Sequence, residues 1–277
     1  MTDPTKPVSF RSDEIDHSDL EQLSAVLDVQ AERPGIRRLR EWAHAALHLQ
    51  PGESALDIGS GTGSETQALA TAITETGRAF GLDPNPGMVR IATERAENAR
   101  SAAQFVVGDV YALPFADGSL DAVRCERVFQ HLTEPARAAA EVARVLRAGG
   151  RAVILDSDWG TAIMHPGNPA VLERITRVML GRTANPLSGR LLRGQLTAAG
   201  LTIEDVGSQA LIQESDDATG PLVQMMTEYA VAEGSITPGE RTALLGELDA
   251  GARSGDFHMS VTMFAYLARK DTSPRPA

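Results

Sequence analysis

The sequence predicts an open α/β sheet whose ligand lies beyond the carboxyl ends of its strands. An apolar run over residues 55–58 leads into a loop with three alternating glycines, Gly59, Gly61 and Gly63, and a helix-forming stretch follows. Glycine has no Cβ, so it serves where the backbone turns sharply or approaches a ligand closely. A second strand is expected over residues 78–83. Strand, glycine loop, helix and strand together form the first crossover of such a sheet.

The spacing of the glycines distinguishes between cofactors. A dinucleotide fingerprint, G-x-G-x-x-G, would place its third glycine at position 64. This chain has Ser64 there, and Gly63 comes one place earlier. The order Asp57-x-Gly59-x-Gly61-x-Gly63 instead resembles motif I of the class I S-adenosylmethionine (SAM) methyltransferases.

Acidic residues follow the next two strands. Asp83 ends the second strand, 20 residues after Gly63. A carboxylate at this place can accept hydrogen bonds from both ribose hydroxyls of an adenosyl cofactor. A third apolar run, residues 104–107, leads into Asp109 and Val110. In the family that motif I resembles, the matching Asp accepts a hydrogen bond from the adenine amino group.

The resemblance spans roughly residues 50–157 and includes a turn at 117–119 before a fourth strand, and a fifth strand at 152–155. This stretch is similar to the small-molecule branch of the family, which contains ubiquinone/menaquinone C-methyltransferases and antibiotic-tailoring enzymes. The resemblance implies an α/β fold with a Rossmann-like, seven-stranded class I methyltransferase sheet and helical lid additions.

The flanking segments are expected to complete this fold. Helices before residue 49 are open to two roles, covering the SAM site or packing on the sheet. Later helices begin at the cap Asn168-Pro169 and at the capping box of Thr237 and Glu240. We expect a disordered start with N-terminal helices over residues 1–49 and a SAM-binding core over residues 50–157. Residues 158–270 should form a helical lid and the last two strands, which are expected at 201–212 and 260–268. A tail follows at residues 271–277.

Composition narrows the classes of function. The formal charge of −11 argues against a nucleic-acid groove, which needs concentrated Lys and Arg. The single cysteine, Cys125, excludes an intramolecular disulfide framework and suits a reducing cytosol. Residues 1–12 lack an apolar signal region, and no apolar run approaches membrane-spanning length. We expect a cytoplasmic monomer or homodimer without membrane insertion.

The resemblance assigns roles to the cofactor site. Gly59, Gly61 and Gly63 let the backbone approach the methionine part and the ribose of SAM. Asp57 either orients the loop, contacts the methionine amino group, or only caps loop amides. Met88 either packs on adenine or belongs to the core.

The segment after the fourth strand is expected to complete the site. The residue just after that strand, Cys125 or Glu126, commonly binds the methionine amino group through its carbonyl. Antibiotic-tailoring relatives can use a histidine of this segment, with an Asp that ends strand five, to deprotonate a hydroxyl. The matching residues are His131 and Asp156, whose neighbouring strands bring them to the same edge of the sheet.

The assignment of a base stays open at this point. Relatives with two consecutive histidines differ from this chain, which has Gln130 first, and a histidine at a helix start is often a structural hydrogen bonder. Asp156 is open to three roles: orienting His131, holding an acceptor hydroxyl or amine, or capping a turn. Trp159 either walls the acceptor or packs in the core. His44, four residues before His48, suits a solvated helix face rather than a metal site.

The predicted activity is SAM-dependent methyl transfer to a small, largely apolar molecule, with O- or N-transfer favoured over C-transfer and a place in secondary metabolism. SAM is the expected cofactor, and no metal is required because alignment of the acceptor with the methyl carbon is the main task. The alternatives are a SAM-binding enzyme that catalyses a cyclisation or elimination, and a non-enzymatic SAM-binding protein. Six methionines suit either an adaptable acceptor pocket or core packing: Met164, Met179, Met225, Met226, Met259 and Met263.

Overall fold

Seven strands form one sheet in the order β3-β2-β1-β4-β5-β7-β6. The computed structural model describes residues 20–272. The strands are β1 (Ser54–Ile58), β2 (Arg78–Asp83), β3 (Gln104–Val107), β4 (Leu120–Glu126), β5 (Leu146–His165), β6 (Leu201–Ile212) and β7 (His258–Lys270). β1 to β5 pair with one another in parallel, and β7 runs antiparallel between β5 and β6. This order confirms the predicted Rossmann-like, seven-stranded sheet.

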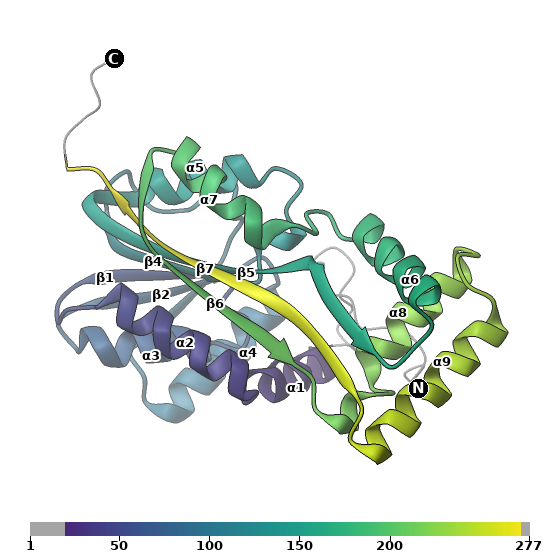
Figure 1. The fold of residues 1–277 in the computed structure, drawn as a ribbon. Coiled ribbons are helices and arrows are strands. Elements are labelled where there is room, and N and C mark those ends of the chain that lie inside the picture. Colours follow the sequence, from purple (N-terminus) through teal and green to yellow (C-terminus); the bar gives the residue numbers. More distant parts are fainter. Residues whose placement is uncertain (1–19, 273–277) are drawn as a thin grey trace.

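Helices cover both faces of this sheet (Figure 1). Among the described residues the α-helices are α1 (Leu20–Ala31), α2 (Pro34–Leu47), α3 (Ser64–Ile73), α4 (Pro86–Ala99), α5 (Pro135–Val145), α6 (Pro169–Arg182), α7 (Ser188–Ala198), α8 (Pro221–Ala232) and α9 (Pro238–Ser254). Figure 1 shows α5 and α7 on one face and α2, α3 and α4 on the other. The disordered start expected at residues 1–15 lies outside the described residues, as do residues 273–277 of the disordered tail expected at 271–277.

The caps that the sequence predicted are present. Asn168 accepts a hydrogen bond from the Ala170 amide at 2.9 Å at the start of α6. Thr237 and Glu240 form the reciprocal capping box of α9. Each cap satisfies backbone donors that a helix start leaves without an intrahelical acceptor.

β5 is longer than the predicted strand at both ends. Residues 156–158 pair with β7 at 262–264, and 163–165 pair with 258–260 after a break in register. The strand continues past Asp156 because β7 supplies hydrogen-bonding partners there, which a single-strand pattern does not reveal. The outer parts of β5 and β7 extend toward α6, α8 and α9, at the right of Figure 1, and form the helical addition.

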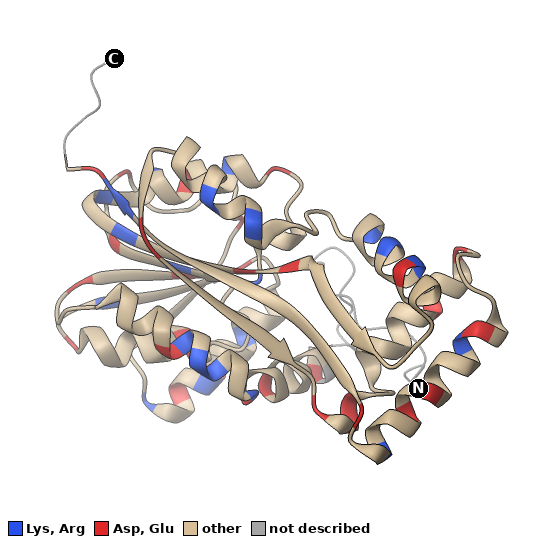
Figure 2. Ribbon diagram, in the orientation of Figure 1, with Lys and Arg blue, Asp and Glu red and all other residues tan. Residues whose placement is uncertain are grey.

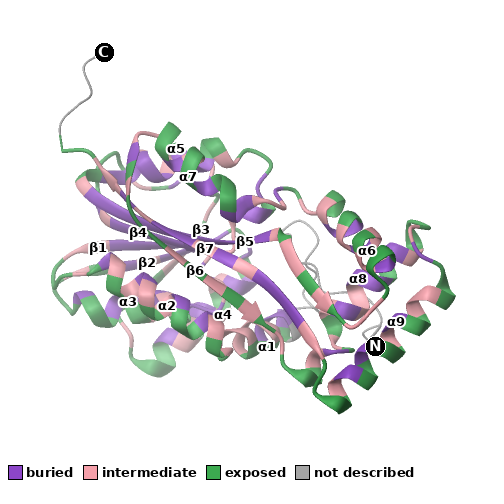
Figure 3. Cartoon of the chain, in the orientation of Figure 1, coloured by how far each residue is buried: buried purple, intermediate pink, exposed green. Residues whose placement is uncertain are grey.

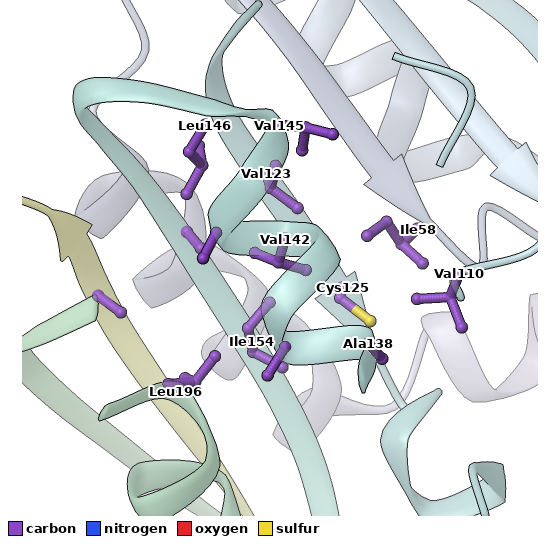
Figure 4. Close-up of a cluster of buried hydrophobic side chains, with 14 of the residues drawn as sticks. Ile58, Val110, Val123, Cys125, Ala138, Val142, Val145, Leu146, Ile154 and Leu196 are labelled. Carbon is purple, nitrogen blue, oxygen red and sulfur yellow. The ribbon is translucent and has the colours of Figure 1, made fainter. Parts of the chain in front are cut away.

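The central strands are almost fully buried, whereas the edge strand β6 alternates in exposure (Figure 3). Figure 4 shows Cys125 and Val110 within one apolar cluster with Ile58, Val123 and Ile154. Burial in this cluster raises the pKa of the Cys125 thiol, so the side chain is an apolar packing group.

A buried arginine organises the charges beneath the glycine loop. Arg124 of β4 is 2% exposed. Its guanidinium contacts Asp57 at 3.1 Å, Glu65 at 2.9 Å and the Glu126 carboxylate. Burial alone would lower the pKa of Arg124, but these three carboxylates raise it above its ordinary value. β1, α3 and β4 are therefore joined by one cation.

Two further cations complete this cluster. Arg40 of α2 contacts Glu126 at 2.8 Å and Glu65 at 3.1 Å. Arg127 reaches Glu126 at 3.3 Å. Burial would raise the pKa of Glu126, yet the surrounding guanidinium groups hold it well below its usual range.

Replacing Arg124 should destabilise the fold strongly. Arg124→Met leaves the buried Asp57 and Glu126 and the partly buried Glu65 short of their shared cation, and loss of the partner of a buried charge costs about 3–5 kcal/mol. Urea unfolding checks this prediction. The matched control is Arg147→Met, because Arg147 is 46% exposed and pairs with Asp121 near the surface; it should cost no more than about 1 kcal/mol. Equal losses in both variants would contradict the central role of Arg124.

Candidate functional site

The parallel register brings the predicted site residues to one edge of the sheet. Ile58 of β1 pairs with Leu82 of β2 and with Cys125 of β4. Asp83 pairs with Val107 at the end of β3. The glycine loop, Asp83 and the segments after β3 and β4 therefore meet beyond the carboxyl ends of neighbouring strands, where open α/β sheets bind ligands.

Hydrogen bonds tie the glycine loop to β2. The amides of Gly59 and Ser60 donate to the Leu82 carbonyl at 2.8 and 3.0 Å. The Gly61 amide donates to Asp83 Oδ2 at 3.0 Å, and the other oxygen of Asp83 accepts from the Asn85 amide at 2.9 Å. Burial raises the pKa of Asp83, although both hydrogen bonds oppose that shift.

The three glycines have different surroundings. A Cβ on Gly63 would lie 2.7 Å from the Phe105 ring, and a Cβ on Gly59 would collide with Val128. Among the described residues, a Cβ on Gly61 would meet Leu27 in ordinary contact, at 3.4 Å. Gly63 therefore permits close packing of the helix on the sheet, while a Cβ at Gly61 would clash with none of the described residues.

The loop also contains a buried polar atom that fits a bound cofactor. Ser60 Oγ has no hydrogen-bond partner among the described residues, although Ser60 is only 8% exposed. Buried hydroxyls nearly always have a partner, and a polar ligand against the loop would provide one. Sequence reasoning did not nominate Ser60, which lies within the motif.

Asp57 and Met88 are enclosed by other side chains. Asp57 is 1% exposed and accepts hydrogen bonds from Thr66 at 3.0 Å and from Arg124 at 3.1 Å. Met88 is 2% exposed and packs with Leu20 and Leu23 of α1. This geometry gives Asp57 an orienting position below the loop and places Met88 beneath α1.

Helix α1 covers the loop side of the site. Its Leu27 faces Gly61, and its Asp28 forms a two-pronged ion pair with Arg95 at 2.8 and 2.9 Å. Gln30 accepts a hydrogen bond from Arg127. α2 therefore packs on the sheet, one of the two roles that the sequence left open, and α1 lies over the glycine loop.

The remaining cofactor candidates differ in accessibility. Asp109 is exposed, and its Oδ1 accepts from the Tyr111 amide at 2.9 Å. Val110 is 7% exposed within the core. The side chains of Cys125 and Glu126 are occupied by the apolar cluster and by arginines, so only their backbone groups are suited to contact a ligand.

Asp156 is held by a dense set of donors at the end of the parallel part of β5. It is fully buried and accepts from the amides of Gln130 at 2.8 Å and Ser157 at 2.7 Å, and from Ser188 Oγ at 3.1 Å. Burial raises the pKa of Asp156 to about 7, against the effect of these hydrogen bonds. Asp156 thus fixes the turn that carries His131, a 3₁₀ segment η2 (Phe129–His131).

Gln130 and Trp159 form one wall near this turn. The Trp159 indole donates to Gln130 Oε1 at 2.9 Å, and the Asn185 amide donates to the Gln130 carbonyl at 2.9 Å. Trp159 is half-buried, whereas His131 is exposed. Gln130, at the position where some relatives have histidine, therefore positions the indole.

Other polar candidates have structural partners. His44 Nε2 lies 2.9 Å from Glu65 within the charge cluster, and Asp158 is fully buried in a two-pronged ion pair with Arg190. Within residues 20–272, no group of His, Cys, Asp and Glu is arranged to hold a metal ion, and no helix has the length and apolar character to cross a bilayer.

Sequence relatives agree with this geometry. A family model described as a methyltransferase domain matches residues 56–154. The uncharacterized 37.1 kDa protein of transposon TN4556 from Streptomyces fradiae is 34% identical over 248 residues, which are 88% of this chain and 70% of that protein. The demethylmenaquinone methyltransferase of Renibacterium salmoninarum is 35% identical over 120 residues, 43% of this chain and 48% of that enzyme. The chain thus spans about half the length of that enzyme.

A solved structure shares the fold at low sequence identity. The SAM-dependent methyltransferase from Aquifex aeolicus has a TM-score of 0.55 and 16% identity, with 92% of this chain and 99% of that chain covered. This likeness concerns the fold alone. Together with the sequence matches and the glycine loop, the seven-stranded order shows that the chain belongs to the class I SAM-dependent methyltransferases, in their small-molecule branch.

Proposed function

We propose that this chain transfers the methyl group of SAM to a heteroatom, oxygen or nitrogen, of a small and largely apolar molecule. The observation that carries the proposal is the loop geometry: the Gly61 amide donates to Asp83 at 3.0 Å, and the nearest described side chain at the Cβ position of Gly61 is Leu27, in ordinary contact at 3.4 Å. The secondary-metabolism role and the monomeric or dimeric state that the sequence suggested remain parts of this proposal.

The site suggests an orientation for SAM. The ribose hydroxyls bind Asp83, and adenine lies toward Asp109 and Val110. The methionine part runs along Gly59 and Gly61, where Ser60 Oγ gains its missing partner. The backbone carbonyl of Cys125 or Glu126 accepts from the methionine ammonium. A contact of Met88 with adenine requires movement of α1, because Leu20 and Leu23 enclose the thioether.

SAM supplies an electrophilic methyl group when it is bound. The protein aligns the acceptor, excludes water and manages a proton. Asp57 and Arg124 hold the loop from below, and Trp159 and Gln130 form one wall of the acceptor site. His131 is the proposed acceptor of the proton, because it is accessible and its ordinary pKa suits a base near neutral pH.

Asp156 has a positioning role in this proposal. It accepts from the Gln130 amide, directly before His131 in the chain, so it fixes the turn rather than contacting the acceptor. The raised pKa of Asp156, about 7, means that the carboxyl group gains a proton more readily than an exposed aspartate as pH falls. Its burial separates it from the acceptor.

A direct assay tests the activity. The full-length protein is incubated with methyl-labelled SAM and a panel of phenols, amines and carbon acids, and the products are separated by mass. Formation of S-adenosylhomocysteine with a labelled phenol or amine supports the proposal. Conversion of an acceptor without S-adenosylhomocysteine would favour a cyclisation or elimination, and SAM binding without conversion of any acceptor would favour a non-enzymatic binding protein.

Asp83→Ala should weaken SAM binding by about tenfold or more. A hydrogen bond to a charged group contributes roughly 1.5–3 kcal/mol, and tenfold in affinity is about 1.4 kcal/mol. Titration calorimetry with SAM measures the change, with Asp117→Ala as a control because Asp117 is 81% exposed and distant in the chain from the loop. Unchanged affinity in a folded Asp83→Ala protein would refute the ribose placement.

His131→Ala should slow methyl transfer far more than it weakens SAM binding. A positioned general base contributes on the order of 10²–10⁴-fold to the rate. Single-turnover transfer to a phenol acceptor, with SAM saturating, measures the effect, and the loss should shrink as pH rises and the phenol ionises unaided. A rate loss below about threefold would remove the base role and leave alignment as the contribution of this turn.

A further inference from the structure

A hollow of about 640 Å³ lies between the outer half of β5 and helix α6. Leu172, Thr176 and Leu180 line it from one face of α6, and Ala162 and Met164 line it from β5. Its volume falls within the range of small-molecule sites, which is about 300–1,000 Å³. None of its lining residues belongs to the cofactor site described above.

The walls of the hollow are mainly apolar and adaptable. Met164, Met226 and Met259 contribute three thioethers from β5, α8 and β7. Flexible methionines suit a surface that must adjust to ligands of different shape. Three of the six methionines whose role the sequence left open therefore line the hollow. Met226 and Met259 also belong to the buried core of the helical addition, as Met179 does, whereas Met164 is only partly buried.

The charges at the rim are paired with each other. Arg177 contacts Glu173 at 2.7 Å, one turn away on α6. His165 lies 3.4 Å from Asp256. Figure 2 shows acidic and basic residues interspersed along α6. Because each charge has a local counter-charge, the hollow favours a neutral ligand over an anionic or cationic one.

The inner end of the hollow, at Ala162, lies close in the chain to Trp159 of the acceptor wall. Ala162 follows Trp159 by three residues, at most about 10 Å along the strand, across the break in its register with β7. At the opposite wall, Leu180 comes near the end of α6, and the next loop returns to the site, where Asn185 bonds the Gln130 carbonyl and Pro186 accepts from the Trp159 amide. β5 and α6 thus lead from the wall of Gln130 and Trp159 outward along the hollow.

We propose that this hollow binds the neutral apolar tail of an elongated acceptor whose reacting head lies against Trp159 and Gln130. The inference rests on the proposed function and narrows its substrate class to molecules with a polar head and a flexible hydrocarbon portion. Such a tail gains affinity with each methylene that leaves water, by about fourfold per group.

Binding of 4-alkylphenols, from butyl to nonyl, tests the inference. Calorimetry is performed on the full chain saturated with S-adenosylhomocysteine. Affinity should rise by about fourfold for each methylene that enters the hollow. A flat dependence on chain length in the wild-type protein would overturn the inference.

The same Ala→Trp substitution at two positions shows whether the alkyl chains bind in the hollow or elsewhere on the surface. Ala162→Trp fills its inner end and should abolish the chain-length dependence. Ala170→Trp should retain it, because Ala170 is exposed on α6 and does not line the hollow. Thr176→Trp repeats the block from α6, in case Ala162→Trp does not fold. Equal chain-length dependence in the folded lining variants and the control would show that the chains bind elsewhere and would overturn the inference.

A fluorescence measurement tests the continuity with the acceptor wall. The chain has two tryptophans, so Trp42→Phe leaves Trp159 as the reporter. Nonylphenol should change the emission of Trp159, excited at a wavelength that phenols do not absorb. Tail binding without such a change would overturn the link between the hollow and the reacting head.

The two proposals fail in distinguishable ways. All folded variants should bind S-adenosylhomocysteine with wild-type affinity, since none of these substitutions touches the cofactor site. If the wild-type protein does not bind S-adenosylhomocysteine, the proposed function is refuted, and with it the assignment of the tail to a methyl acceptor. If it binds that product but shows no chain-length dependence, only the tail site is refuted.

Discussion

The hydrogen bond from the Gly61 amide to Asp83 joins the two strands on which the site depends. It fixes the glycine loop of β1 against the carboxylate that ends β2, at 3.0 Å. The Leu82 carbonyl accepts from two more loop amides on the same side. These bonds fix the loop backbone against β2, so a cofactor that binds there meets a prearranged backbone.

A buried network of charges supports this loop from the other side. Arg124 links Asp57 of β1 to Glu65 of α3 and Glu126 of β4. Buried ion pairs seldom stabilise a fold more than apolar packing would, so the value of this network lies in the orientation it imposes. It holds the side chain of Asp57 below the glycine loop and fixes β4, whose end leads to the turn of Gln130 and His131.

The sequence predicted the helices, strands and caps that depend on residues close to one another in the chain. The glycine spacing predicted the first crossover, and β6 occupies residues 201–212, where a strand was expected. The caps at Asn168 and Thr237 depend on side chains a few residues apart, so they too were predictable. The order of the strands followed from the resemblance rather than from the pattern itself.

Features that depend on distant partners were not predictable in the same way. β5 extends to His165 because β7, about a hundred residues later, pairs with it. The Trp159–Gln130 bond and the position of α1 over Gly61 arise only in the folded chain. The sequence shows Arg124 as a charged residue within an otherwise apolar strand. Its three carboxylate partners could not be predicted, because they come from separate elements.

The helical addition and the Rossmann-like core have separate tasks in this account. The core holds the cofactor through backbone and carboxylates, whereas the addition of α6, α8 and the outer strands provides apolar surface for the acceptor. Specificity for the acceptor can thus vary through residues of the addition without disturbing the loop, in keeping with the general separation of fold and site.

The placement of the cofactor can be checked in a crystal structure of the complex with S-adenosylhomocysteine. We expect both ribose hydroxyls within hydrogen-bond distance of Asp83, the methionine part along Gly61, and a polar partner for Ser60 Oγ. A complex in which the ribose lies away from Asp83, or in which the ligand binds outside the carboxyl edge of the sheet, would contradict this placement.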